Sequence, residues 1–232
     1  EEYRLYFHKI RFDLPMLKQI IANGLPAGFQ NSVIALANVV VQTNINAFGK
    51  MAMAGCGAYS KIEGFGFLPV NCFTMALTTF VSQNLGAKEY ERAKKGARFG
   101  ILCSISIAEL IGIVIYAAAP LLISAFNSDP DVVAYGAAQA RTVTLFYFLL
   151  AFSHCIAAIL RGSGKSAIPM VVMLCVWCIL RVTYITVTVH FIPDIRVVFW
   201  AYPLTWSISS AIFLVLFLRG KWVYGFENTT NA

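Results

Sequence analysis

The sequence predicts an all-α, polytopic membrane protein, a bundle of six transmembrane helices, and three observations favour this fold class. Hydrophobic residues make up 59% of the 232 residues and charged residues only 12%, whereas about a quarter of the residues in soluble domains are charged. The apolar residues form six long runs, each long enough to cross the roughly 30 Å hydrocarbon core of a bilayer as a helix. Short polar clusters separate the runs, as expected where lipid covers the runs and water meets the clusters.

Polar breaks divide the chain into the expected spans, which are 19–46, 56–82, 99–125, 132–160, 167–191 and 197–218. Turn-forming Asn, Gly, Asp and Pro residues mark the breaks at 46–50, 127–131 and 192–196. No stretch is rich enough in Gly, Ser or Pro to act as an interdomain linker. We therefore expect a single transmembrane lobe at 19–218, with a cytoplasmic interfacial segment at 1–18 and a cytoplasmic tail at 219–232.

The cations indicate how the lobe is oriented. Of the 18 Lys and Arg residues, 13 fall on one side of the expected membrane, and only Lys50 and Arg196 fall on the other. Because cytoplasmic loops are enriched in Lys and Arg, the sequence predicts a plasma (inner) membrane protein with both termini in the cytoplasm. The basic loops account for the net charge of +7, so the charge does not indicate a nucleic-acid partner. The expected contact of these cations is the lipid bilayer.

Amide side chains form a stripe along the first span. Asn31, Asn38, Gln42 and Asn46 are seven, four and four residues apart, which places them on one helical face. Amides are costly against lipid, so this face either lines a water-filled substrate cavity or bonds neighbouring helices as structural glue.

A longer polar stripe runs along the second span. Its members recur at steps of three or four residues and are Ser60, Glu63, Phe67, Asn71, Thr74, Thr78 and Ser82. A continuous polar face with an aromatic residue in it is what the wall of a transport pathway requires. We therefore predict that Phe67, Asn71, Thr74 and Thr78 line the same cavity as the amides of the first span.

Glu63 is the candidate for ion coupling or a charge switch. An ionisable side chain inside a span is costly enough to suggest a function, although a structural anchor near the outer membrane surface is the alternative. Lys61 lies two residues away and cannot stack on Glu63 along the helix. Arg141, inside the fourth span, is the expected counter-charge, unless it snorkels or is purely structural. The sequence assigns no partner to Glu109, His154 or Arg181.

Two prolines are candidate hinges. Pro69 lies in mid-span, where a proline removes a backbone hydrogen bond and bends the helix. Gly64 and Gly66 precede it within two turns. Pro26 should loosen the first span near its cytoplasmic end, with a packing notch as the alternative.

The sequence predicts no enzyme, no metal site and no bound cofactor. Its three histidines, His8, His154 and His190, are scattered, and neither HExxH nor GxSxG occurs. Cys175 and Cys178 form a CxxC without a second ligand pair, so packing is the expected role of these two residues. A faint phosphate-loop pattern at 162–166 is too short and follows no soluble strand.

Four strings together resemble the carboxy-terminal half of a MATE (multidrug and toxic compound extrusion) transporter. They are GLPAGFQ at 24–30, IEGF at 62–65 with PVN at 69–71, QNLGA at 83–87, and LRGSG at 160–164 followed by Pro169. The four occur in the right order on the right span ends, and the resemblance covers residues 14–220.

The resemblance implies a fold and an activity. MATE proteins have twelve helices in two six-helix lobes related by a pseudo-twofold axis along the membrane normal, in agreement with parallel-repeat transporters in general. They export organic cations and other amphipathic compounds by alternating access, driven by proton or sodium influx. By this analogy the chain is the second lobe, the amino-terminal lobe is its partner, and its first two spans face the central cavity.

The sequence departs from part of the family. Some MATE branches carry an acidic residue on the helix that corresponds to the first span, but this chain has no Asp or Glu between Leu14 and Gly55. The coupling ion, a proton or sodium, therefore stays open. The alternatives are a flippase of lipid-linked precursors from the same superfamily, which would favour a more cationic cavity, and a non-transporting membrane scaffold.

Overall fold

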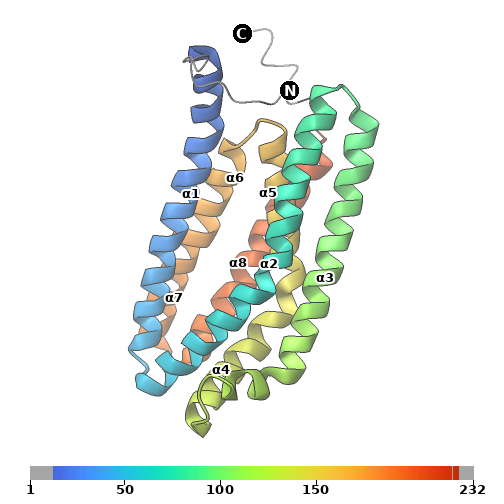
Figure 1. The fold of residues 1–232 in the computed structure, drawn as a ribbon. Helices are drawn as coiled ribbons and strands as arrows, with labels where there is room; N and C mark the ends of the chain where they lie inside the picture. Colours follow the sequence, from blue (N-terminus) through green and yellow to red (C-terminus); the bar gives the residue numbers. More distant parts are fainter. Residues whose placement is uncertain (1–12, 221, 225–232) are drawn as a thin grey trace, which may run out of the picture.

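The computed structural model describes residues 13–220 and 222–224, and the regular elements of that part of the chain are all helical (Figure 1). In chain order they are α1 (Leu14–Asn46), α2 (Lys50–Gly86), α3 (Tyr90–Ser124), α4 (Pro130–Val143), η2 (Thr144–Phe146), α5 (Tyr147–Gly162), α6 (Ala167–Met173), η3 (Leu174–Leu180), α7 (Arg181–Phe191) and α8 (Ile195–Leu218). The helices make six segments long and apolar enough to cross a membrane, because α4 continues into α5 and α6 into α7. The all-α, six-span prediction is confirmed.

The helices extend beyond the apolar runs that predicted them. α1 begins at Leu14 and not at residue 19, since the Asp13 side chain accepts a hydrogen bond from the Met16 N–H at 3.0 Å and Pro15 occupies the first turn. α2 and α3 likewise start earlier than their apolar runs. Hydropathy marks only the lipid-covered part of a helix, whereas hydrogen bonding continues into the interfacial region. Of the predicted terminal segments, residues 1–12, 221 and 225–232 lie outside the described residues.

The turns gather at two ends of the bundle (Figure 1). The start of α1, the turns at 86–90 and 162–167 and the end of α8 lie at one end, and the turns at 46–50, 124–130 and 191–195 lie at the other. Within the described part of the chain, this arrangement brings the basic residues that the sequence assigned to one side of the membrane to the same end.

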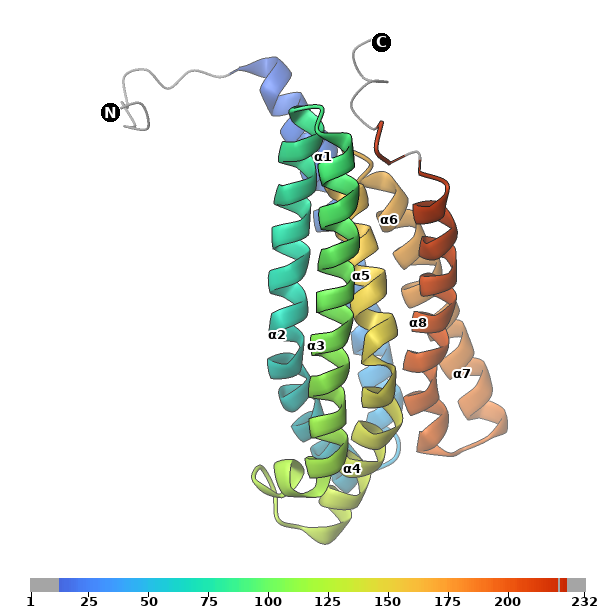
Figure 2. The same ribbon diagram turned by 90° about the vertical axis from the view of Figure 1, so that its right-hand side faces the viewer.

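Two groups of helices can be followed along the bundle, one around α2 and one around α1 (Figure 1). α2 packs most closely against α3, α4 and α5. α1 contacts α2, α6, η3 and α7 to a similar and smaller extent, and α8 joins α5 to α7 (Figure 2). The contact of α1 with α2 is therefore small beside that of α2 with its other neighbours, although the two helices follow each other in the chain.

Glycines bring the backbones of α2 and α4 into contact. A Cβ added at Gly55 would collide with the Val132 carbonyl oxygen and lie 2.8 Å from the Gly136 nitrogen. A Cβ added at Gly136 would lie 2.8 Å from the Gly55 oxygen. Small residues allow this close approach of membrane helices, which maximises dispersion contacts.

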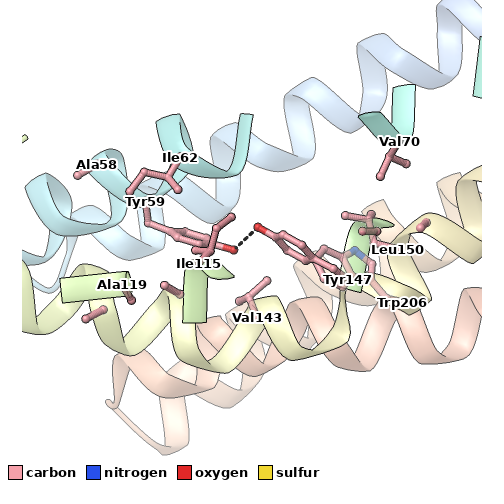
Figure 3. Packing of buried hydrophobic residues seen from close by; sticks show 14 of the residues in the cluster. Ala58, Tyr59, Ile62, Val70, Ile115, Ala119, Val143, Tyr147, Leu150 and Trp206 are labelled. Carbon is pink, nitrogen blue, oxygen red and sulfur yellow. Dashed lines mark hydrogen bonds between the residues drawn. The ribbon is translucent and has the colours of Figure 1, made fainter. Parts of the chain in front are cut away.

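A tyrosine pair lies inside the largest apolar cluster (Figure 3). The Tyr59 and Tyr147 hydroxyls are 3.0 Å apart among side chains such as Ile115 and Val143. Each hydroxyl satisfies the other, since a buried unpaired hydroxyl is costly. The Tyr59 hydroxyl also donates to Glu63 Oε1 at 3.4 Å, so the α2–α5 core holds Glu63 in place.

Two spans contain breaks that the sequence did not indicate. In the fourth, the 3₁₀ turn η2 interrupts the helix, and Glu109 of α3 accepts a hydrogen bond from the Phe148 N–H at 3.1 Å. This carboxylate satisfies one of the amide groups left free where α5 begins. In the fifth, η3 is π-helical, and such segments are frequent at functional sites because they re-aim the side chains that follow.

Candidate functional site

A cavity of about 550 Å³ is lined by α1, α2, α5, η3, α7 and α8. Five of the eight predicted lining residues contribute to it, namely Asn31, Asn38, Phe67, Asn71 and Thr74. Ser60 and Glu63 of the same α2 stripe line it as well. The polar faces of the first two spans therefore meet at one hollow.

The other three predicted residues lie away from this cavity. The Gln42 amide donates to Asn46 Oδ1 at 2.9 Å, within α1. Thr78 donates to the carbonyl oxygens of Thr74 at 2.8 Å and Ala158 at 3.3 Å, the second of which is on α5. The Thr78 contact joins α2 to α5, as structural glue would, whereas the Gln42–Asn46 hydrogen bond stays within α1 and joins no second helix.

The structure does not bring Lys61 or Arg141 to Glu63. The exposed Lys61 ammonium lies 5.6 Å from the centre of the Phe126 ring. The Arg141 guanidinium lies 6.0 Å from the Tyr116 ring and borders a separate surface hollow. Neither cation lines the Glu63 cavity, because two residues along a helix is about half a turn and Arg141 is on the face of α4 next to α3.

Arg181 is the cation that interacts electrostatically with Glu63 across the cavity. Only 2% of its surface is exposed, and its Nη2 and Nε donate to Thr205 Oγ1 at 2.8 and 3.3 Å. The guanidinium lies 5.1 Å from the Trp177 ring centre and 4.6 Å from that of Tyr202. Aromatic faces and a neutral hydroxyl thus hold this charge without cancelling it.

An aromatic cluster forms part of the cavity lining. The His154 ring contacts Phe67 edge-on at 5.0 Å and Trp177 at 5.3 Å between ring centres. Trp177 donates its indole N–H to Ser209 Oγ at 3.1 Å, and Trp206 lies 6.4 Å from Trp177. The serine anchor fixes the indole, of which only 7% is exposed, so the cluster forms a rigid aromatic edge of the cavity.

Three cavity-lining side chains carry buried polar atoms with no hydrogen-bond partner among the described residues. These atoms are Gln30 Oε1, His154 Nε2 and Trp206 Nε1. The Gln30 amide nitrogen is already used, since it contacts Met173 Sδ at 2.8 Å. A buried unpaired polar atom costs about 1–3 kcal/mol, so these three favour occupancy of the cavity by water or a polar ligand.

Sequence reasoning predicted Phe67 but missed Arg161, Arg181, His154, Trp177 and Trp206 as site residues. Arg181 had one usable signal, because an arginine inside a span suggests a function by default. Trp177 and Trp206 had none, because they lie on different spans and no spacing within a single helix relates them. The turn of η3 that aims Trp177 and Arg181 inward is a feature of the folded backbone.

Comparison with known proteins gives the same fold and family. The chain matches the MatE family over residues 26–187. It is 26% identical over 203 residues to the probable multidrug resistance protein YoeA of Bacillus subtilis (strain 168), a match that covers 86% of this chain and 43% of that protein. It is 27% identical over 216 residues to the probable multidrug resistance protein NorM of Thermotoga maritima, covering 88% of this chain and 44% of that protein.

Solved structures share the helical fold of this chain over about half of their length. The outward-facing conformation of a multidrug resistance MATE family transporter of the MOP superfamily superimposes with a TM-score of 0.85 at 16% identity. The match covers 96% of this chain and 50% of that structure. The chain thus spans about half the length of the proteins that it matches. The fold and the family agree with the resemblance seen in the motifs, and the chain belongs to the MatE family.

Proposed function

We propose that this chain forms one lobe of a secondary active transporter that exports drugs or metabolites, organic cations included, by proton- or sodium-coupled antiport with alternating access. The observation that carries the proposal is the cavity between the polar faces of α1 and α2, lined by unpaired buried polar atoms. Sites of this kind, largely aromatic with a few placed polar groups, suit small amphipathic compounds.

The lobe is proposed to be the carboxy-terminal one, with the amino-terminal lobe of the same transporter as its partner. Support comes from the order of the four family strings along the chain and from its coverage of about half of each solved relative. The basic end of the bundle, which carries Lys88, Arg92 and Arg98, is proposed to face the cytoplasm, because positive loops are retained on that side.

Coupling is proposed to act through Glu63 and Arg181. An ion or proton at Glu63 would weaken its attraction to Arg181, and the cavity would then prefer a different tilt of α2. Such a switch needs an ion that binds the two states with different affinity. Pro69, inside α2, and Pro26, inside α1, are the proposed hinges.

A transport assay tests the proposed function directly. The full-length transporter that carries this lobe, reconstituted in liposomes, should move a fluorescent amphipathic dye when a proton or sodium gradient is imposed. Collapsing the gradient with an ionophore should stop net movement. Dye movement no faster than in protein-free liposomes, under either gradient, would contradict the proposal.

Replacing Pro69 with Ala tests the hinge. Restoring the backbone hydrogen bond should straighten α2 and slow dye efflux about threefold or more, since the lost bend changes the balance between the two states. Pro120→Ala is the matched control, because Pro120 also lies inside a helix, α3, but away from the cavity. Equal efflux rates in the Pro69→Ala variant and the parent would make the bend merely structural.

One observation favours a second candidate, a flippase of lipid-linked precursors. The cavity lining includes two arginines, Arg161 and Arg181, and a pyrophosphate headgroup needs such cations. A flippase would move a fluorescent isoprenyl pyrophosphate lipid across the bilayer and leave a soluble dye untouched. The exporter would do the reverse.

A further inference from the structure

The charged residues that line the cavity do not balance. Glu63 is the only acidic one among the described lining residues, and Arg161 and Arg181 are both cationic. Arg181 interacts with Glu63 and offsets its charge. Arg161 is thus left as the uncompensated charge of the cavity.

The Arg161 guanidinium has no hydrogen-bond or ion-pair partner within the part of the chain that the structure describes, where the one ion pair joins Lys94 to Glu91 at the start of α3. The Arg161 side chain is only half-exposed. A guanidinium that is partly removed from water and lacks a counter-charge is unfavourable, and such a group binds carboxylate or phosphate strongly.

His154 lies on the same face of α5, two turns before Arg161, and both residues line the cavity. Its Nε2 is buried and unpaired. Phe67 and Trp177 flank the imidazole at ring distances of 5.0 and 5.3 Å. A cation, an unpaired ring nitrogen and two aromatic faces thus border one space.

We infer that Arg161 and His154 bind the negatively charged group, a carboxylate or phosphate, of an aromatic compound whose ring packs against Phe67 and Trp177. The inference rests on the proposed function, because it names the substrate class of the same cavity. It shifts that class from simple organic cations to aromatic anions and zwitterions. The offset of Glu63 by Arg181 removes the repulsion that a lone carboxylate would exert on such a ligand.

A matched pair of dyes tests the inference. Rhodamine B carries a free carboxylate, and its ethyl ester has the same ring system without that negative group. Binding of each dye to the purified full-length transporter is measured by fluorescence anisotropy. The parent should bind rhodamine B more tightly than the ester.

Arg161→Gln should weaken rhodamine B binding roughly tenfold or more, the loss of one charge-assisted contact, and change ester binding less than about twofold. Arg161→Lys should restore part of the preference, because it returns the charge without the planar fork. Arg141→Gln is the matched control, since Arg141 stacks on Tyr116 outside the cavity, and it should leave both affinities unchanged.

Equal affinity for the two dyes, or unchanged rhodamine B binding in Arg161→Gln, would overturn the inference. Competition experiments distinguish an aromatic solute from a lipid headgroup as the source of the negatively charged group. If the site takes an aromatic solute, 1-naphthyl phosphate should displace rhodamine B. Displacement by farnesyl pyrophosphate alone would assign the site to a lipid headgroup and overturn the aromatic-solute assignment. If the transporter moves the ester but shows no preference for the carboxylate, the exporter proposal stands and the anion site is overturned. If it binds rhodamine B through Arg161 but transports neither dye, the anion site stands and the exporter proposal is overturned.

Discussion

Replacing Glu63 with Gln is expected to remove most of the gradient-driven efflux. Gln keeps the shape of the side chain and can still accept the hydrogen bond from the Tyr59 hydroxyl, but it carries no charge and cannot take up a proton or hold sodium. Its attraction to Arg181 across the cavity is lost as well. The two conformations of the lobe would then no longer respond to the ion, and the gradient could not drive export.

The expected size of the loss in efflux depends on how strongly the Glu63 charge shifts the balance between the two conformations. A difference of about 1.4 kcal/mol between two states changes their ratio tenfold, so removing the charge should lower gradient-driven efflux by about tenfold or more. Initial rates of dye efflux from proteoliposomes measure this. Exchange of dye without a gradient should persist in Glu63→Gln, because the cavity itself remains.

Glu109→Gln is the matched control for this experiment. Glu109 is also a carboxylate inside a span, but it contacts the Phe148 N–H on the far side of the α3–α5 contact and does not line the cavity. An amide oxygen can accept the same hydrogen bond, so efflux should change little. Parent-like, gradient-dependent efflux in Glu63→Gln would remove Glu63 from the coupling mechanism.

Gly55→Val is expected to have the largest effect on folding. The new side chain would meet the backbone of α4 at Val132 and Gly136, and a backbone cannot rotate away as a flexible side chain can. Overpacking in a core costs about 1–3 kcal/mol and occasionally more, and this contact belongs at the upper end. The α2–α4 contact would open, and α2 would lose the support that positions Glu63.

Thermal unfolding of the detergent-solubilised protein, followed by size-exclusion chromatography, measures this effect. Gly57→Val is the matched control, two residues along α2, because a Cβ at Gly57 has no neighbour within 4 Å. Gly57→Val should keep a melting temperature close to that of the parent. Equal melting temperatures for the two variants would show that α2 and α4 do not depend on this contact.

The polar stripe of α2 shows what residue spacing can predict. Steps of three and four placed Phe67, Asn71 and Thr74 on one face, and all three line the cavity. Thr78 continues the same stripe but lies where α2 meets α5, so it bonds Ala158 instead. Spacing gives the face of a helix, but the neighbour of that face changes along a helix of this length.

The counter-charge of Glu63 shows the opposite case. Arg141 was the expected partner, and Arg181 interacts with Glu63 in the structure. Both arginines lie inside spans, and nothing in the spacing distinguishes them. The difference arises because α4 turns Arg141 toward Tyr116 of α3, while the π-helical η3 directs Arg181 toward the cavity.

The sequence by itself determined the six spans, the family, the two ends of the bundle and the polar faces of the first two spans, because each follows from composition, charge or the period of a single helix. Only the tertiary structure decided which helices face each other. These contacts set the limits of the cavity, the electrostatic interaction of Glu63 with Arg181 and the lack of a counter-charge at Arg161. Such contacts depend on how closely backbones approach, as at Gly55 and Gly136, and on local breaks such as η2 and η3. The residue pattern of a single helix indicates neither the backbone approaches nor the local breaks.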